Sequence, residues 1–405
     1  MWSLIRANRW KSAGLIAGMA LLFVIFGFAL AATLDPSLGP FGVIVAIVIW
    51  AVMMLTAVAA GEKILLAQAG AREIDRQGAP QLFNVVEEMA IASGLRVQPK
   101  IYLIDSPVPN AFAVGLSPKR SAVAVTTGLL ARLDRDELQG VVGHEIAHIV
   151  NRDTLFMTLA GVTLGAIIML ADVRLRGVRF SSSRSSRNSG GAGAILAIVA
   201  LLIVILAPIL ARLLYFACSR RREYLADACS AQFTRYPDGL ASALEKISGG
   251  QVATQDSSRV LAPMYIVSPL AAHGGGASMF STHPPAQDRI RVLRGIGKNA
   301  SLAAYEDAYR ALHADRSVVG ARNLRASVDA PVRDASAEAG DVDVHKGWRQ
   351  AREALRSLDG LLTLACACGL RTRLPPGFNQ PTVKCPKCGT IHSTSALSSL
   401  PSPLP

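Results

Sequence analysis

Residues 141–148 read VVGHEIAH, and two histidines in this stretch stand four residues apart around a glutamate. Side chains four residues apart project from the same face of a helix, so His144 and His148 can present two ring nitrogens to one zinc ion. Glu145 stands beside them, close enough to take a proton from metal-bound water. This H-E-x-x-H pattern favours a zinc site over the alternative, a buried helix whose histidines are hydrogen-bonded in a core.

A catalytic zinc needs a third protein ligand and keeps one position open for water. One solution places a glycine and a third histidine just downstream, but Asn151 and Thr154 hold those positions here. The other solution is a distant glutamate. The glutamates that follow His148 are Glu223, Glu245, Glu306, Glu338 and Glu353.

Four apolar runs have lengths suited to membrane spans. They cover residues 13–33, 41–60, 155–171 and 192–215. The mean hydropathy of +0.35 is too high for an ordinary soluble domain. The first run is too long for a cleaved signal peptide, so we expect an uncleaved anchor. The net charge of +13 comes from arginine clusters, several of them beside these runs, which favours membrane flanks and disfavours nucleic-acid binding.

The orientation follows from the basic flanks. Basic residues before the first run place the N terminus in the cytoplasm, and four crossings return the chain there after residue 216. The predicted location is therefore the inner (plasma) membrane, with several spans and an active site that faces the cytoplasm. Five arginines between the third and fourth runs contradict this topology, which leaves open whether that hairpin crosses the bilayer fully.

The third and fourth runs select Glu223 as the third ligand. His148 lies seven residues before the third run and Glu223 eight residues after the fourth, or about 10 Å and about 12 Å along a helix. Because the two runs form an antiparallel pair, both residues arrive at nearly the same depth. Asp227 follows one turn after Glu223 on the same face, where its carboxylate can accept the second N–H of a zinc-bound histidine.

A segment of mixed structure separates the second and third runs. Apolar positions at helical spacing predict a helix over 81–94. Three short apolar stretches predict strands at 100–105, 111–115 and 122–126. Asp134, with Glu137 three residues later, predicts the start of the helix that carries the histidines.

SRRREYLAD at 219–227, together with HEIAH, closely resembles the HtpX-type membrane zinc metallopeptidases, relatives of the type I CAAX prenyl proteases. NAFAVG at 110–115 is similar to the family's edge strand beside the zinc. THPPAQDRI at 282–290 is similar to its later motif, which bears a histidine and an arginine. The resemblance covers about residues 1–295. It implies a four-span membrane endopeptidase that opens to the cytoplasm and takes part in quality control of damaged or unassembled membrane proteins.

The resemblance assigns roles to matching residues. It makes His144, His148 and Glu223 the ligands of a catalytic zinc and Glu145 the catalytic base. His283 is our candidate donor to the tetrahedral oxyanion, with Arg289 next. The alternative for His283 is a loop histidine before two prolines.

The stretch that resembles the edge strand is expected to bind substrate. An extended peptide can add to such a strand through backbone hydrogen bonds, so that it is recognised through its backbone and not through its sequence. The residues concerned are Asn110, Ala111, Phe112 and Ala113.

Four cysteines late in the chain predict a second zinc site, with a structural role. They form two tight turns, each closed by a glycine, at Cys366 and Cys368 and at Cys385 and Cys388. Four thiolates suit a closed tetrahedral zinc, as in a zinc ribbon, although the first pair is C-x-C rather than C-x-x-C. A module this small folds only with its metal. Ribbons bind protein or nucleic acid, and the partner of this one stays open.

The sequence thus predicts a mainly α membrane protein with four transmembrane helices, a cytoplasmic α+β zincin-like metallopeptidase domain and a small zinc ribbon. The predicted parts are an anchor (1–60), a peptidase domain (61–300), a linker (301–347), a helix plus ribbon (348–393) and a disordered tail (394–405). The predicted partners are protein substrates and the lipid bilayer.

The predicted function is hydrolysis of membrane or misfolded proteins by a zinc endopeptidase. One alternative is a membrane-anchored adaptor that displays the ribbon on an inactive protease scaffold, and the presence of Glu145 argues against it. The other alternative is a prenyl-protein processing peptidase. That function needs a large chamber within the membrane, for which four spans are too few.

Overall fold

The computed structural model describes residues 36–159, 220–249, 264–267 and 284–394, together with separate residues between 10 and 31. Within these ranges, residues 315, 326, 338, 339, 341, 359–361, 375–377 and 379 are not described. The fourth apolar run, most of the third and His283 lie outside the described residues.

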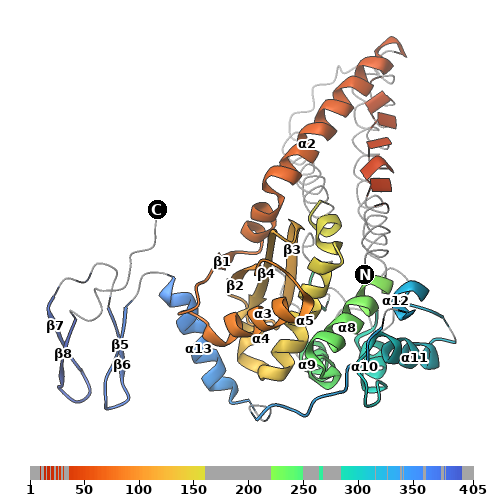
Figure 1. Cartoon of the computed structure of the whole chain (residues 1–405). Helices are drawn as coiled ribbons and strands as arrows, with labels where there is room; N and C mark the ends of the chain where they lie inside the picture. The colour runs from red at the N-terminus through yellow and green to blue at the C-terminus, as the bar shows by residue number, and fades with distance from the viewer. Residues whose placement is uncertain are drawn as a thin grey trace, which may run out of the picture.

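One long apolar helix, α2 (Gly39–Gln68), projects from the rest of the protein (Figure 1). It follows a short 3-10 helix, η1 (Pro36–Leu38). In the described part of the chain, α2 is the one helix that is long and apolar enough to cross a membrane. Its large side chains face outward; Leu55, for example, is 70% exposed. This helix covers the second predicted apolar run and supports membrane association.

The base of α2 is fixed to a four-stranded sheet. The strands are β1 (Ala71–Glu73), β2 (Lys100–Ile104), β3 (Ala111–Ser117) and β4 (Arg120–Thr126). Their order is β1-β2-β4-β3, with β2 and β4 parallel and the other pairs antiparallel. Three of these strands were predicted, and β1 was not. Leu65 and Leu66 of α2 pack against Phe112 and Val114 of β3, which places the span directly on the sheet.

Helix α5 (Arg135–Val150) lies at the centre of the helical layer and is buried over most of its length (Figure 1). It begins at the predicted capping box, in which Asp134 and Glu137 each accept a hydrogen bond from the other's backbone N–H. Gly140 allows the start of α9 (Pro237–Gly249) to lie against it, because a Cβ there would come within 2.6 Å of the Leu240 nitrogen.

The remaining helices of the domain pack on α5 or on its neighbours (Figure 1). The predicted helix α3 (Pro80–Ser93) ends at Gly94, whose φ of 75° lies in the left-handed region. The short α4 (Thr127–Arg132) follows β4 directly. The others are α8 (Arg220–Thr234), α10 (Ala286–Arg294), α11 (Leu302–Leu312) and α12 (Ala321–Arg325).

The prediction of a linker over 301–347 is corrected by the structure. Helix α11 places Tyr305 in the main core, fully buried. Further on, Arg333 donates to the Asp136 carboxylate at the start of α5 and to the backbone oxygen of Thr234. This stretch is rich in small and charged residues, and its order comes from partners far away in the sequence.

The C-terminal part consists of α13 (Val344–Ser357) and two hairpins, β5 (Leu362–Ala365) with β6 (Arg371–Leu374) and β7 (Thr382–Lys384) with β8 (Ile391–Ser393). The helix in the predicted helix-plus-ribbon part (348–393) therefore starts earlier, at Val344, and ends before β5. Helix α13 packs on α4 at Gly347, where a Cβ would lie 2.5 Å from the Ala131 oxygen. The C-terminal helix is thus attached to the peptidase domain.

Candidate active site and metal centres

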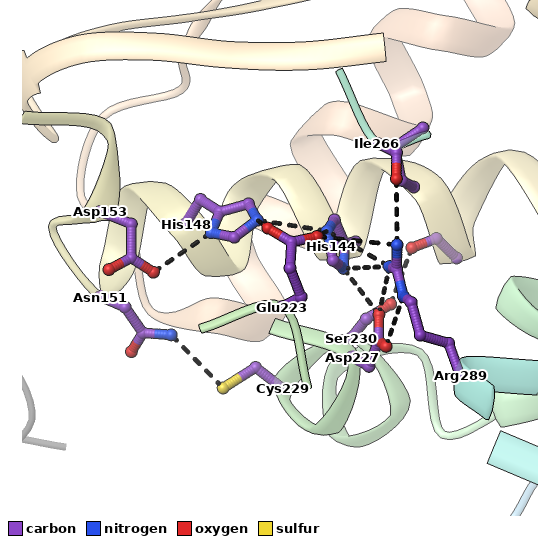
Figure 2. A network of polar contacts seen from close by, with 11 residues as sticks. His144, His148, Asn151, Asp153, Glu223, Asp227, Cys229, Ser230, Ile266 and Arg289 are labelled. Atoms are coloured by element: carbon purple, nitrogen blue, oxygen red, sulfur yellow. Dashed lines mark hydrogen bonds and ion pairs between the residues drawn. The ribbon is translucent and has the colours of Figure 1, made fainter. Parts of the chain in front are cut away.

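Helices α5 and α8 bring the three predicted zinc ligands together (Figure 2). The Nε2 atoms of His144 and His148 lie 3.2 Å apart. Glu223 faces both rings: its two carboxylate oxygens each lie 3.6 Å from one of these nitrogens. Glu223 lies 75 residues after His148 in the sequence and contacts both histidines, in agreement with the prediction that His148 and Glu223 arrive at nearly the same depth.

This geometry fits one zinc ion. With Zn–N bonds of about 2.0–2.1 Å, two nitrogens on a tetrahedral zinc are separated by about 3.3 Å. The observed separations of 3.2 and 3.6 Å match that spacing. Two imidazoles and one carboxylate are also the donor set of catalytic zinc, which leaves a fourth position for water.

The outer nitrogen of His144 faces a buried ion pair. Its Nδ1 lies 2.9 Å from Asp227, and Arg289 donates to both oxygens of that carboxylate at 2.6 and 2.8 Å (Figure 2). An ionised carboxylate only accepts, so Nδ1 carries the proton and Nε2 keeps its lone pair for a metal. Asp227 therefore occupies the position predicted for it.

The charges around His144 shift two pKa values in opposite directions. Burial raises the pKa of Asp227, but Arg289 and His144 outweigh it and hold that pKa below its ordinary value. Burial and Arg289 lower the pKa of His144, while the carboxylates of Asp227 and Glu223 raise it, to a net value of about 9. The site therefore stabilises positive charge where a metal cation would be bound.

Asp153, which was not predicted as a site residue, contacts the second histidine, His148. Asp153 is buried, and its carboxylate lies 3.1 Å from Nδ1 of His148. Helical spacing does not predict this contact, because α5 ends before Asp153. Arg152 adopts a φ of 64°, a left-handed conformation that is rare for arginine, and this turn directs Asp153 back to the ring. The available signal was an aspartate within one turn of the helix end.

Glu145 lies beside the metal ligands and is almost completely buried. Burial raises its pKa, and the negative charge of Glu223 acts in the same direction, against the nearby histidines and Arg289. A carboxylate whose pKa is raised binds a proton more readily, which suits a group that accepts a proton and later returns it.

Of the two predicted oxyanion donors, the structure describes only Arg289. His283 lies outside the described residues. Arg289 is fully buried, and its guanidinium donates to Asp227 and to the backbone oxygen of Ile266. These bonds give Arg289 a positioning role toward His144 and leave little freedom to contact substrate.

The edge strand β3 offers one backbone position to the active-site cleft. In an antiparallel pair, alternate residues point their backbone groups toward the partner or away from it. Asn110 points toward β4, since its oxygen accepts from Thr126, whereas the Ala111 oxygen points away and accepts from Ile266 at 3.0 Å. Ala113 therefore also points away from β4, and it lines the cleft beside His144 and Glu145.

The other predicted substrate-binding residues are engaged elsewhere. The Asn110 side chain is buried and donates to the backbone oxygen of Val267. Phe112 lies in the apolar cluster under α2. Of the four residues of the predicted substrate strand, Ala113 is the one that lines the cleft, and its contact with substrate stays a prediction.

The four late cysteines also converge. The Sγ atoms of Cys366 and Cys388 lie 3.4 Å apart, and those of Cys368 and Cys385 lie 3.6 Å apart. All four lie within 4.8 Å of one another, and Zn–S bonds of about 2.3 Å place two thiolates on one zinc about 3.8 Å apart. The donors come from the β5–β6 and β7–β8 turns, as predicted. Cys229, by contrast, is buried, which raises the pKa of its thiol to about 11.

Comparisons with known proteins agree with this geometry. The family model described as Peptidase family M48 matches residues 76–297. The Protease HtpX homolog of Dictyoglomus thermophilum is 44% identical over 298 residues, which cover 74% of this chain and 95% of the relative. The homolog of Listeria monocytogenes serotype 4a is 40% identical over 301 residues, covering 72% and 98%.

Among solved structures, that of S. mikatae Ste24p aligns with a TM-score of 0.37 and 18% identity, over 72% of this chain and 67% of that one. The family model covers the residues from just before α3 to just after α10, which include the metal ligands on α5 and α8. The resemblance to HtpX-type peptidases is thus confirmed over most of the chain. The chain belongs to peptidase family M48 and is a metalloprotease.

Proposed function

We propose that this metalloprotease hydrolyses peptide bonds of membrane or misfolded proteins at the cytoplasmic face of the membrane, as part of protein quality control. Its catalytic zinc is held by His144, His148 and Glu223. The observation that carries this proposal is the convergence of two Nε2 atoms and a carboxylate at spacings of 3.2 and 3.6 Å.

When bound, zinc supplies a Lewis acid for the scissile carbonyl and lowers the pKa of water. The residues of the chain do the rest. Glu145 accepts a proton from the attacking water and passes it to the amine of the leaving group. Asp227 and Asp153 accept hydrogen bonds from the Nδ1–H groups of His144 and His148, which keeps both Nε2 lone pairs directed at the centre.

The cleft suits an extended, partly apolar peptide. Ala113 lines it with backbone groups that face away from β4, where an added strand would bond to them. Met157, Met264 and Tyr265 line the same cleft and pack against the apolar cluster that joins α2 to β3. The cleft therefore lies next to the base of a membrane helix, which favours membrane proteins as substrates.

A second zinc, bound by the four late cysteines, would have a structural role. It would tie the two C-terminal hairpins to each other, because each hairpin contributes two thiolates. Thiolate zinc persists in a reducing compartment, which supports a cytoplasmic location for this module.

The test compares detergent-purified wild type with Glu145→Gln on casein and on a membrane protein. We expect two zinc ions per chain in both proteins and a loss of activity in the variant of at least 10²-fold, because the proton acceptor is removed. His144→Ala should lose one zinc and all activity. If the wild type and Glu145→Gln cleave equally slowly with zinc bound, the adaptor function replaces the peptidase function.

A further inference from the structure

Each metal-binding histidine contacts an aspartate that faces an arginine, but only at His144 does the arginine hydrogen-bond to the aspartate. His144 contacts Asp227, which receives two hydrogen bonds from Arg289. His148 contacts Asp153, and the other oxygen of that carboxylate faces Arg222, with Nε at 3.6 Å. Each histidine thus contacts a buried carboxylate, and each carboxylate faces a buried arginine. Around His148, Asp153 lies just after the end of α5 and Arg222 lies in the first turn of α8.

Arg222 is unusually placed for an arginine next to an active site. It is 7% exposed, its guanidinium lies 4.7 Å from the centre of the Phe156 ring, and it lines the cleft. Among the described residues, its Nε and Nη1 atoms are buried without a hydrogen-bond partner. Buried donors of a charged group are costly when unpaired, so Arg222 requires an acceptor.

We propose that Arg222 and Asp153 form a second positioning pair, which fixes His148 for zinc as Arg289 and Asp227 fix His144. This inference rests on the zinc centre of the proposed function. The 3.6 Å gap between Arg222 and Asp153 exceeds a hydrogen bond by about half an ångström. A small shift of the arginine on the Phe156 ring closes it.

The pair matters because one contact does not orient a carboxylate. The terminal torsion of aspartate is broad, so each contact to its carboxylate restricts the plane of Asp153 further. A bond from Arg222 to the oxygen that does not face His148 restricts that plane and with it the direction of the His148 ring. Removal of a group that hydrogen-bonds to a metal ligand typically lowers metal affinity by about 10–100-fold.

The experiment measures zinc affinity in the full-length protein by competition with a chelator. The zinc lost in His144→Ala identifies the catalytic centre. We expect Asp153→Asn to weaken zinc binding there by about 10–100-fold and Arg222→Gln to weaken it by a smaller factor. In the Asp153→Asn background, Arg222→Gln should have almost no further effect, because its partner is already absent.

The matched control is Arg310→Gln. Arg310 donates to Glu306, another buried carboxylate, at 2.8 Å on α11, outside the cleft. This control should leave zinc affinity unchanged. Melting temperatures of the metal-free variants separate a general loss of stability from a specific loss of metal affinity.

Three results would overturn the pair. Zinc affinity within about twofold of wild type in both single variants is the first, and additive effects in the double variant are the second. The third is a raised KM for Arg222→Gln with unchanged zinc affinity, which would make Arg222 a substrate contact. If His144→Ala loses no zinc, the zinc centre itself fails, and that outcome is distinct from failure of the pair.

Discussion

At the scale of single residues, the environment of His144 decides how the metal competes with protons. Asp227 and Glu223 raise the pKa of His144 to about 9 against the opposing effects of burial and Arg289. A histidine must be neutral to bind zinc, so metal binding releases this proton. The same carboxylates that orient the ring therefore make metal binding dependent on pH.

We expect the zinc affinity of the catalytic centre to rise with pH, by up to about tenfold per unit, until about pH 9. Below that pH His144 is protonated and the proton must be displaced; above it the dependence ends. Competition titrations between pH 6.5 and 9.5 measure this. Asp227→Asn removes one cause of the raised pKa, so its dependence should end at a lower pH. A wild-type affinity that does not change between pH 7 and 9 would contradict this account.

At the scale of elements, close packing on α5 positions the site. Gly140 and Gly143 lie on this helix one turn apart, but they face different neighbours. A Cβ at Gly140 would meet the backbone of α9, with Leu240 nitrogen at 2.6 Å, whereas a Cβ at Gly143 would meet the side-chain hydroxyl of Ser230 at 3.0 Å. Backbone atoms cannot move aside as a hydroxyl can.

Gly140→Ala should therefore lower the melting temperature by several degrees, through a steric cost of about 1–3 kcal/mol. Gly143→Ala is the control, since it introduces the same residue into the same helix. Its smaller steric conflict is offset by the helix preference of alanine over glycine, about 0.5–1 kcal/mol. Differential scanning fluorimetry in detergent measures both variants. Equal melting temperatures would show that α9 does not need this close approach.

At the scale of the whole molecule, the apolar helix α2 and the C-terminal module are both attached to the peptidase domain. Leu65 and Leu66 fix α2 to the sheet, and Ala354 and Leu355 of α13 belong to the main core. The two cysteine-bearing hairpins lie beyond that helix (Figure 1). The described core contacts thus end with α13, and we expect the hairpins to depend on a metal of their own.

Cys385→Ser should unfold the hairpins and leave the peptidase intact. One thiolate fewer breaks the closed zinc site on which so small a module depends. We expect zinc content to fall from two to one per chain, proteolytic sensitivity to appear after residue 358, and casein cleavage to continue at the wild-type rate. Cys229→Ser is the control, as that thiol is buried away from the module. Loss of both zinc ions would contradict the independence of the two sites.

The sequence by itself determined the features that local chemistry controls. The capping box at Asp134, the α3 helix up to Gly94 and the three longer strands follow from periodicity and from cap residues within a few positions. The ligand Glu223 followed from counting helical rise on two antiparallel runs, and the cysteine cluster followed from spacing. Strand β1 was missed because its three residues, ARE, carry no apolar alternation.

Only the tertiary structure decided the contacts that need a distant partner. The stretch 301–347 reads as a linker, yet Tyr305 and Arg333 gain their order from the main core and from Asp136 and Thr234. Asp153 reaches His148 through a left-handed turn at Arg152 that no spacing rule predicts. The physical reason is the same in each case. A buried charge or an irregular turn is stable only when the rest of the fold supplies its partner, and that partner is not visible from neighbouring residues.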